Sequence, residues 1–296
     1  MVDLVIVGSI ALDNIKTPFG YVENVPGGSA THASIAASFF ARPGIVGVVG
    51  EDFNHFDVFH SKNISIEGLK VVKGKTFRWS GYYEYDMNQA HTLETQLNVF
   101  ENFKPELPDS YKNARYVFLA NIDPELQLSV LEQMKNPLVV LDTMNYWIEN
   151  RREQLIDVIK KSNILLLNDA EARELFKTTN LISAGKKSLE LGLDAVVIKK
   201  GEHGVLLFTG KEMFLLPGYP LENVRDPTGA GDSFAGAFTG YLSKNSLNEE
   251  YIRKAVVYGS AVASFNVEDF SFNNLKKIKL QDIELRYNEF KNIIRF

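Results

Sequence analysis

The sequence of 296 residues contains no cysteine. Disulfide bonds and zinc sites built from thiolates are therefore excluded. No apolar run approaches the roughly 18 residues that a membrane-spanning helix needs. Acidic residues outnumber Lys and Arg, which gives a formal net charge of −5. Because affinity for nucleic acid rests on concentrated positive charge, this balance argues against nucleic acid as a partner.

Several common nucleotide-binding and metal-binding patterns are also missing. The sequence has no Gly-x-x-x-x-Gly-Lys-Ser/Thr phosphate-binding loop, and Gly8-Ser-Ile-Ala11 does not match the Gly-x-Gly-x-x-Gly dinucleotide fingerprint. The five histidines are scattered, and none lies at metal-ligand spacing from another. Near the N-terminus, Asp3 stands where a signal peptide would carry basic residues, so we expect a cytoplasmic protein with no membrane partner.

Short apolar runs alternate with helical patterns along most of the chain. We predict strands at 2–7, 45–49, 116–120, 138–141, 164–167 and 195–198, and a hairpin at 205–208 and 213–216. We predict helices at 29–41, 54–62, 181–191, 232–243 and 249–265, further helices beginning near 124, 149 and 169, and a charged C-terminal helix. This alternation predicts an α/β fold with a mostly parallel sheet and helices on both faces.

Residues 71–103 have a different character, rich in aromatic and β-forming side chains. Two extended runs, 75–86 and 91–103, flank a polar turn and predict a hairpin rather than a strand–helix–strand unit. Together with about 14–26, this segment is expected to form a small β lid on one domain spanning 1–296. The candidate lid contacts to a substrate are Arg78, Trp79 and Tyr83, although such aromatics also serve packing or a dimer face.

The most informative stretch is 224–238, where a polar loop passes through Gly229-Ala230-Gly231 into a helix. A helix N-terminus presents unpaired N–H groups and attracts anions, and glycines let a phosphate approach those groups. Asp232 stands where the loop becomes the helix. An isolated Asp there is usually a helix cap, but the glycines in front of it favour a general base beside a phosphoryl group in transfer.

Polar side chains follow most of the predicted strands of the large sheet. Ligands in an open α/β sheet collect at the carboxyl ends of the strands. Each such residue alone is common in this class of fold, but together with Asp232 they predict one rim that can hold a site. These strand-end residues are Asp13, Asn14, Asn121, Asp123, Asp142, Asn168 and Lys199.

The segment Asp226-Pro-Thr-Gly-Ala-Gly-Asp232 resembles the C-terminal signature of the ribokinase-like (PfkB) family of carbohydrate and nucleoside kinases. Gly27-Gly28 resembles the family's N-terminal diglycine, and the resemblance covers essentially the whole chain. It implies ATP-dependent phosphorylation of a hydroxyl of a small sugar. Asp232 would take the hydroxyl proton, and the amides of Gly229, Ala230 and Gly231 would form an anion hole.

The resemblance also implies sites for the metal ion and the nucleotide. Asn168 and Glu171 match the family's Asn-x-x-Glu motif and would hold Mg²⁺ through water, the alternative being a helix capping box. Asp226 would be a ligand of a possible K⁺. The candidate ATP contacts are Lys199, Gly201, Gly204 and Thr228. The small-residue run 258–263 is either a flank for the adenine or a packing face.

On the acceptor side, the resemblance implies contacts from Asp13, Asn14, Gly27, Gly28, His32 and Asn121. His32 stands where ribokinases carry an Asn sugar ligand, so the hydroxyl pattern recognised here need not be that of ribose. A nucleoside such as adenosine is the first alternative acceptor. A catalytically inactive sugar or nucleotide sensor is an alternative of another class, while a nicotinamide dehydrogenase lacks its fingerprint. A homodimer through the lid is also expected.

Overall fold

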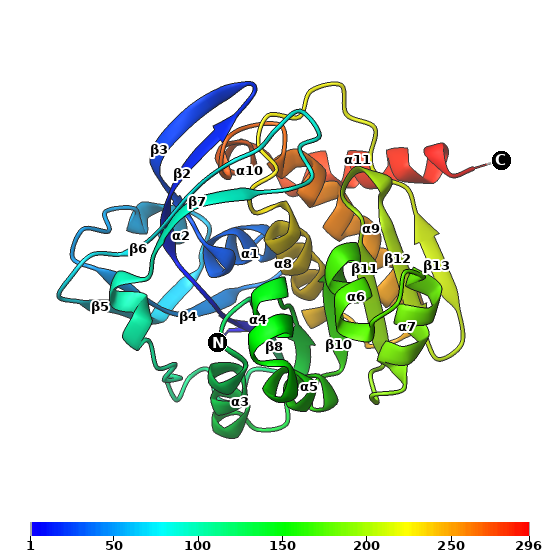
Figure 1. The fold of residues 1–296 in the computed structure, drawn as a ribbon, viewed down its shortest axis with the longest axis horizontal. Helices are drawn as coiled ribbons and strands as arrows, with labels where there is room; N and C mark the ends of the chain where they lie inside the picture. The colour runs from blue at the N-terminus through cyan, green and yellow to red at the C-terminus, as the bar shows by residue number, and fades with distance from the viewer. Residues whose placement is uncertain (1, 296) are drawn as a thin grey trace.

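The computed structural model describes residues 2–295, and a nine-stranded sheet runs through it (Figure 1). Its order is β13-β12-β11-β10-β9-β8-β1-β4-β5. The strands are β1 (Leu4–Val7), β4 (Pro43–Gly50), β5 (Ser65–Val72), β8 (Tyr116–Leu119), β9 (Leu138–Leu141), β10 (Ile164–Asn168), β11 (Ala195–Lys199), β12 (Val205–Thr209) and β13 (Met213–Leu216). All neighbours from β5 to β11 pair in parallel, whereas β12 pairs antiparallel with both β11 and β13. The predicted mostly parallel sheet is confirmed.

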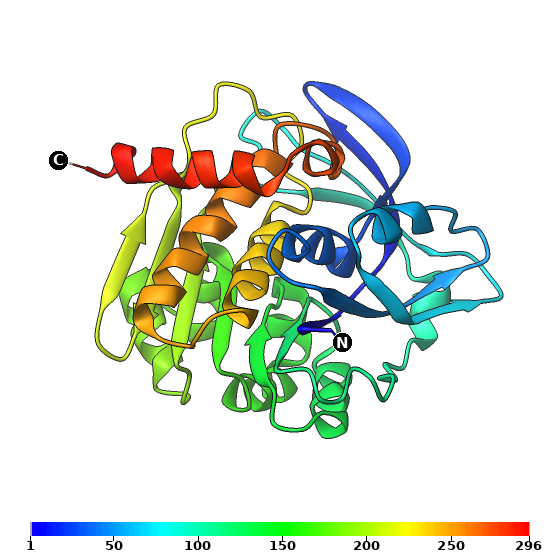
Figure 2. The ribbon, with the colours of Figure 1, turned by 180° about the vertical axis from the view of Figure 1, so that it is seen from behind.

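Helices cover both faces of this sheet, as predicted (Figures 1 and 2). One face carries α1 (Ser29–Ala37), α2 (Phe56–Ser61), α8 (Ala230–Ser243), α9 (Glu249–Asn266) and α10 (Asn273–Lys277), with α11 (Leu280–Ile293) packed on α9. The other face carries α3 (Pro124–Gln133), α4 (Asn145–Asn150), α5 (Arg152–Lys160), α6 (Asp169–Phe176) and α7 (Leu181–Leu189). No helix within residues 2–295 has the length and apolar character to cross a membrane.

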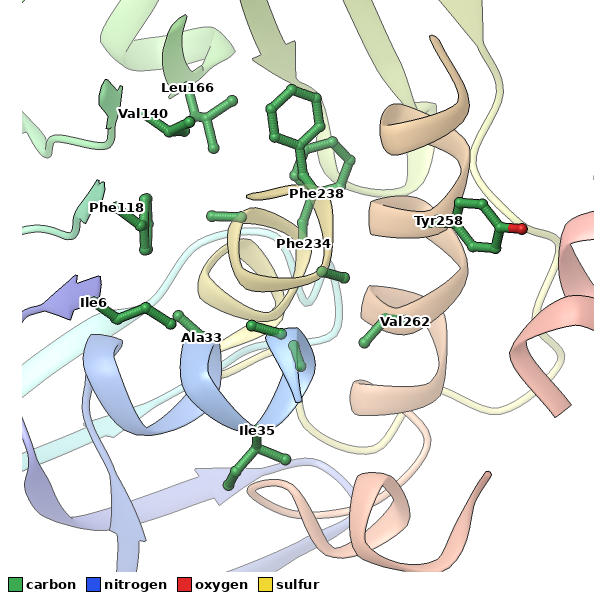
Figure 3. Packing of buried hydrophobic residues seen from close by; sticks show 14 of the residues in the cluster. Ile6, Ala33, Ile35, Phe118, Val140, Leu166, Phe234, Phe238, Tyr258 and Val262 are labelled. Carbon is green, nitrogen blue, oxygen red and sulfur yellow. The ribbon is translucent and has the colours of Figure 1, made fainter. Parts of the chain in front are cut away.

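The two apolar cores follow from strand alternation. Side chains of successive residues in a strand point to opposite faces, so Leu4 and Ile6 of β1 enter one core while Val5 and Val7 enter the other. In the first core, strand residues face the aromatic side of α8, where Phe234 stands (Figure 3). Buried strands with both faces covered need continuous apolar runs, which is the pattern that predicted them.

A second sheet of four strands lies beside the first, in the order β3-β2-β6-β7. Its strands are β2 (Ala11–Thr17), β3 (Gly20–Gly27), β6 (Phe77–Tyr82) and β7 (His91–Gln96). β6 and β7 form the predicted hairpin, and β2 joins it through β6. The 71–72 part of the predicted lid instead ends β5 in the large sheet.

The predicted extended run at 91–103 was too long, because β7 ends at Gln96. A short 3-10 helix, η1 (Asn98–Asn102), follows it. Asn98 has φ of 49°, a left-handed conformation that Asn tolerates better than most residues and that ends a strand. The Nδ2 of Asn98 also donates to the Thr76 carbonyl at 3.0 Å, which holds the chain in the turn.

Several helix boundaries also differ from the sequence-based expectation. The helices expected at 29–41, 54–62 and 181–191 are shorter, at Ser29–Ala37, Phe56–Ser61 and Leu181–Leu189. The helix expected near 149 is two helices, α4 and α5, separated at Arg151, where φ of −139° interrupts the helical conformation. The helix expected at 232–243 begins two residues earlier, at Ala230, with Gly229 as the N-cap. This last difference places Asp232 inside the first helical turn, where it cannot be the cap.

Candidate active site

The Gly229-Ala230-Gly231 segment, called the cradle below, forms the start of α8. Gly229 has φ of 73° and no side chain that could cap the helix. The Ala230 N–H donates to the Pro227 carbonyl at 3.1 Å, so the predicted place of this amide in an anion hole is wrong. The N–H groups of Gly229 and Gly231 are the candidates for an external acceptor. A Cβ on Gly229 would come within 2.3 Å of Nδ1 of His32, so only glycine fits there. The binding of an anion at this turn stays a prediction.

Asp232 is the third residue of α8 and lies beside the cradle. Burial raises the pKa of its carboxyl to about 7, Asp142 adds to the rise, and the Lys199 ammonium opposes it. A carboxyl that titrates near neutral pH can both lose and accept a proton under working conditions, which suits a general base.

A buried ion pair joins Lys199 and Asp142 across the sheet, with Nζ 2.8 Å from Oδ2. The residues end β11 and β9, so Lys199 reaches over β10. Its Nζ also lies 3.5 Å from where a Cβ of Gly231 would stand, at the mouth of the cradle. Burial disfavours the ammonium, but Asp142 and Glu171 outweigh burial and raise the pKa of Lys199, so it stays charged.

Asp142 was noted in the sequence as a strand end but was not assigned to the site, and the structure gives it a place there. Its Oδ1 accepts the Thr143 N–H at 2.9 Å while its Oδ2 holds Lys199. Gln127 donates to the Asp142 carbonyl at 3.2 Å and to the Ala120 carbonyl at 2.9 Å, which fixes the end of the strand. Both carboxylate oxygens of Asp142 are thus engaged.

Asn168 and Glu171 form a complete capping box at the start of α6. Oδ1 of Asn168 accepts the Glu171 N–H at 2.8 Å, and Oε2 of Glu171 accepts the Asn168 N–H at 2.6 Å. Burial and the nearby Asp142 raise the pKa of Glu171 to about 8. Within residues 2–295 no group of three or more His, Asp or Glu side chains is arranged to bind a metal ion directly.

Asp13 is the third residue of β2, in the small sheet, and lies near Asp226 and Asp232. It is 4% exposed, and burial together with Asp226 raises the pKa of its carboxyl to about 8. Its Oδ1 is buried without a hydrogen-bond partner. Gly27 allows the carboxyl to sit there, since a Cβ at Gly27 would lie 1.9 Å from Oδ2 of Asp13, and Gly28 has φ of 89°.

Asn14 and Asn121 are bonded within the protein. Nδ2 of Asn14 donates to Oγ of Ser80 at 3.0 Å, and its Oδ1 accepts the Asn24 N–H at 2.8 Å, so Asn14 ties three strands of the small sheet together. Oδ1 of Asn121 accepts the Trp147 Nε1–H at 2.8 Å, and its amide nitrogen faces Met144. Their roles as acceptor contacts stay predictions.

His32 lies beneath the cradle, 1% exposed, with its ring edge-on to Phe272 and against Gly229. Burial lowers the pKa of His32 to about 4, so the ring is neutral at working pH. The sequence placed His32 among the acceptor contacts. The structure shows it as a support of the cradle, and a direct contact with the acceptor stays a prediction.

The nucleotide-side glycines meet other parts of the chain. Gly201 begins the 3-10 turn η2 (Gly201–His203), and a Cβ on it would come within 2.4 Å of Oδ1 of Asn88 in the β6–β7 loop. A Cβ on Gly204 would lie 2.0 Å from the Leu216 carbonyl, so this glycine is needed for the β12–β13 hairpin itself. Their contacts with ATP stay predictions.

At the start of the small-residue run 258–263, the structure favours a packing face over a flank for the adenine. The Tyr258 ring stacks on Tyr287 of α11 at 4.4 Å between centroids, and its hydroxyl donates to Glu284 at 2.8 Å. Figure 3 shows Tyr258 pointing away from α8. Gly259 faces the opposite way, and a Cβ there would approach Phe234 to 2.9 Å.

Of the three lid candidates, Tyr83 contacts Thr228, the residue directly before the cradle. The Thr228 hydroxyl donates to the Tyr83 hydroxyl at 3.3 Å. Burial raises the pKa of Tyr83, and the carboxyls of Asp226 and Asp13 add to the rise. Arg78 instead pairs with Asp52 at 3.0 Å, and Trp79 bonds within the small sheet. The hydroxyl of Tyr83, directly after β6 of the small sheet, thus contacts the residue that precedes the cradle.

With Asp232 as the predicted general base, activity should rise with pH through about 7, because a base must be ionised to accept a proton. The measurement is kcat/KM with both substrates far below saturation, which reports groups of the free enzyme. Asp142→Asn removes a negative charge that raises the pKa of Asp232, so the acidic limb of the profile should move to lower pH. A limb that stays in place in this variant would contradict the assignment of that limb to Asp232.

The family model for pfkB family carbohydrate kinases matches residues 1–278. The chain belongs to this family. This pfkB kinase is 30% identical over 260 residues to the cytidine kinase of Thermococcus kodakarensis, covering 86% of the chain and 93% of that protein. Family members transfer a phosphoryl group from ATP to a hydroxyl, so this chain is a phosphotransferase with an alcohol group as acceptor.

Solved structures agree with the fold of this pfkB kinase. The nucleoside kinase of Methanocaldococcus jannaschii superposes with a TM-score of 0.79 at 23% identity, covering 97% of this chain and 98% of that one. A candidate ribokinase II of E. coli, in complex with ATP and Mg²⁺, superposes with a TM-score of 0.81 at 17% identity, covering 98% and 100%. At these identities the likeness shows the fold, and the predicted ribokinase-like architecture is confirmed.

Proposed function

We propose that this pfkB kinase phosphorylates a hydroxyl of a nucleoside, with Asp232 as the general base. The observation that carries the chemistry is the half-buried Asp232 carboxyl in the first turn of the helix that the cradle begins, where desolvation raises its pKa to about 7. The acceptor class is supported by the relative of T. kodakarensis, which acts on cytidine. A free small sugar is the second candidate, since the unpartnered Oδ1 of Asp13 can accept from a sugar hydroxyl with or without a base attached.

In this mechanism the residues divide into an acceptor side and a phosphate side. Asp13 holds hydroxyls of the acceptor, and Asp232 takes the proton from the hydroxyl that attacks. The N–H groups of Gly229 and Gly231 and the Lys199 ammonium meet the negative charge that builds on the transferring phosphoryl group. Each well-placed donor of this kind contributes on the order of 3 kcal/mol to lowering the barrier. Tyr83 closes the acceptor side and excludes water.

We propose Mg²⁺ as the metal that accompanies ATP, on the side of Asn168 and Glu171. The capping box uses only Oε2 of Glu171, which leaves Oε1 for the water shell of a metal ion. Mg²⁺ keeps several waters and is commonly held by few carboxylates, so a direct ligand cluster is not required. When bound, the ion would neutralise charge on the ATP phosphates.

A K⁺ ion beside the cradle stays a proposal that the donor set allows. Asp226 is fully buried; its Oδ1 accepts the Thr228 N–H at 2.9 Å and its Oδ2 the Ser271 N–H at 2.8 Å. Carboxylate and carbonyl oxygens can serve a cation in addition to these bonds. Assays in K⁺, Na⁺ and tetramethylammonium salts at equal ionic strength test it, and equal rates would remove K⁺ from the site.

An ADP-release screen with Mg-ATP over nucleosides, sugars and sugar phosphates tests the proposed function. Turnover of nucleosides at far higher kcat/KM than any free sugar is expected. Preference for a free sugar would select the second candidate. Binding of ligands without turnover of any of them would favour the inactive sensor instead. The presence of Asp232 beside the cradle argues against that outcome, because a sensor needs no base.

We propose that the protein forms a homodimer through the small sheet and acts in the cytoplasm. The edge strands β3 and β7 carry exposed apolar side chains, Tyr21 at 55% and Leu93 at 67%. Leu93→Glu should therefore convert a dimer to a monomer in light scattering, while the matched exposed Leu285→Glu on α11 should leave the mass unchanged. A wild-type protein that is monomeric at high concentration would rule the dimer out.

A further inference from the structure

Asn266, the last residue of α9, connects the two chain segments that flank the cradle. Its side chain is fully buried, at 0% exposure. Its Nδ2 donates to the Thr228 carbonyl at 2.9 Å, directly before the cradle. Its Oδ1 accepts from the Ser233 hydroxyl at 3.1 Å, directly after Asp232. The carboxamide of Asn266 thus bonds both to the residue directly before the cradle and to the residue directly after Asp232.

We propose that Asn266 is a positioning residue that sets the direction of the Gly229 N–H. The Thr228 carbonyl and the Gly229 N–H belong to one peptide group. In a planar trans peptide these two bonds point in opposite directions. Because Asn266 holds the carbonyl toward the buried side, the N–H of Gly229 is directed away from it, toward the cradle. The inference rests on the proposed function of the cradle as an anion hole.

The peptide group between Thr228 and Gly229 needs a hydrogen bond to fix its orientation, because the glycine lets it flip. Glycine lacks a Cβ and populates positive and negative φ about equally, so Gly229 alone does not hold one orientation of the preceding peptide. A flipped peptide would present the Thr228 carbonyl oxygen to the transferring phosphoryl group. An oxygen atom in place of a donor would then repel the charge that the cradle should stabilise.

The buried surroundings of Asn266 stabilise both hydrogen bonds of its carboxamide. His32 is buried against Gly229. Ser233 is fully buried as well. A buried polar group that loses its partner pays a large desolvation cost, so each bond of the carboxamide resists opening. The sequence gives no sign of this link, since Asn266 and Thr228 lie on different elements.

The test compares Asn266→Asp and Asn266→Ala with a matched control, Asn274→Ala. Asp keeps the acceptor for Ser233 but loses the donor to Thr228, whereas Ala loses both. Asn274 also donates two hydrogen bonds, to the Phe265 carbonyl at 3.0 Å and to Glu268 at 2.9 Å, but it does not touch the cradle loop. Both Asn266 variants should lose roughly 100-fold or more in kcat, as removal of one anion-hole donor does.

In the same variants, KM for the acceptor and the affinity for a non-hydrolysable ATP analogue should stay near wild type, because the lost contact acts on the transferring group. Binding of Mg-ADP with fluoroaluminate, a mimic of that group, measures the cradle without turnover and should weaken strongly. Asn274→Ala should keep wild-type kcat and fluoroaluminate binding. Ser233→Ala, which leaves the Thr228 bond in place, should lose much less than Asn266→Asp and covers the case in which the Asn266 variants fail to fold.

Wild-type kcat and fluoroaluminate binding in Asn266→Asp would overturn the proposal. So would a loss of kcat in Ser233→Ala as large as that in Asn266→Asp, because the Thr228 bond would then not be the decisive one. If the wild-type protein phosphorylates nothing, the proposed function fails, but the fluoroaluminate comparison still decides whether Asn266 orients the cradle.

Discussion

Asp232→Asn should abolish phosphorylation while binding of ATP survives. The carboxamide has nearly the shape of the carboxyl but cannot accept the hydroxyl proton, and loss of a general base costs roughly 100-fold to 10,000-fold in rate. The cradle N–H groups come from the backbone and remain in the variant. The measurements are ADP release with the best acceptor and calorimetric titration with a non-hydrolysable ATP analogue.

Asp282→Asn is the matched control for this variant. Asp282 also stands third in its helix, α11, where Oδ2 accepts the Lys279 N–H at 2.7 Å. Loss of that capping contact should lower stability slightly and leave turnover unchanged. If Asp232→Asn turned over at the wild-type rate, the proposed base would be wrong, and a loss of ATP binding along with activity would point to a structural role.

Gly229→Ala should cost at least 100-fold in kcat. A residue with a Cβ in the left-handed region costs about 1–2 kcal/mol, and this Cβ would also press on buried His32. The cheapest relief is a change in backbone φ, which turns the cradle N–H groups away from the phosphoryl group. Gly192→Ala is the matched control, since Gly192 has φ of 98° and open space around its Cβ position.

We expect Gly192→Ala to lower the free energy of unfolding by about 1 kcal/mol through backbone strain and to keep full activity. Comparing kcat and thermal unfolding of the two variants separates cradle geometry from strain alone. Equal kcat in both variants would mean that the backbone of Gly229 does not carry the chemistry. A Gly229→Ala variant further changed by His32→Ala should regain stability without regaining the full rate.

The fold was predictable because its signals are local. The strands of the parallel sheet read as short continuous apolar runs, since both faces are covered, and they bound the helices between them. The end of β7 near Asn98 was harder to predict, because the left-handed turn there depends on a contact with Thr76, which lies 22 residues earlier in the chain. The predicted start of α8 was two residues too late, because small residues such as Ala230 and Gly231 occur both in loops and in the first turn of a helix.

The candidate site was predictable where a motif stands on contiguous residues, as at the cradle and at Gly27-Gly28. The pair of Lys199 and Asp142 was not, because it crosses an intervening strand and depends on the strand order. The link from Asn266 to Thr228 was missed for the same reason. His32 was placed on the acceptor side from its position in a motif, whereas its location under the cradle depends on the packing of α1 against α8.

The interior position of β1 in the sheet has a consequence for folding. β1 is synthesised before the other strands of its sheet, but one of its two neighbours is β8, so that Leu4 pairs with Tyr116. Contacts between such distant residues pay a large loop-closure entropy and form slowly. The site needs Asp13 near one end of the chain and Asn266 near the other, so it should be among the last parts to assemble during refolding. Recovery of ligand binding should then lag behind recovery of helical circular dichroism.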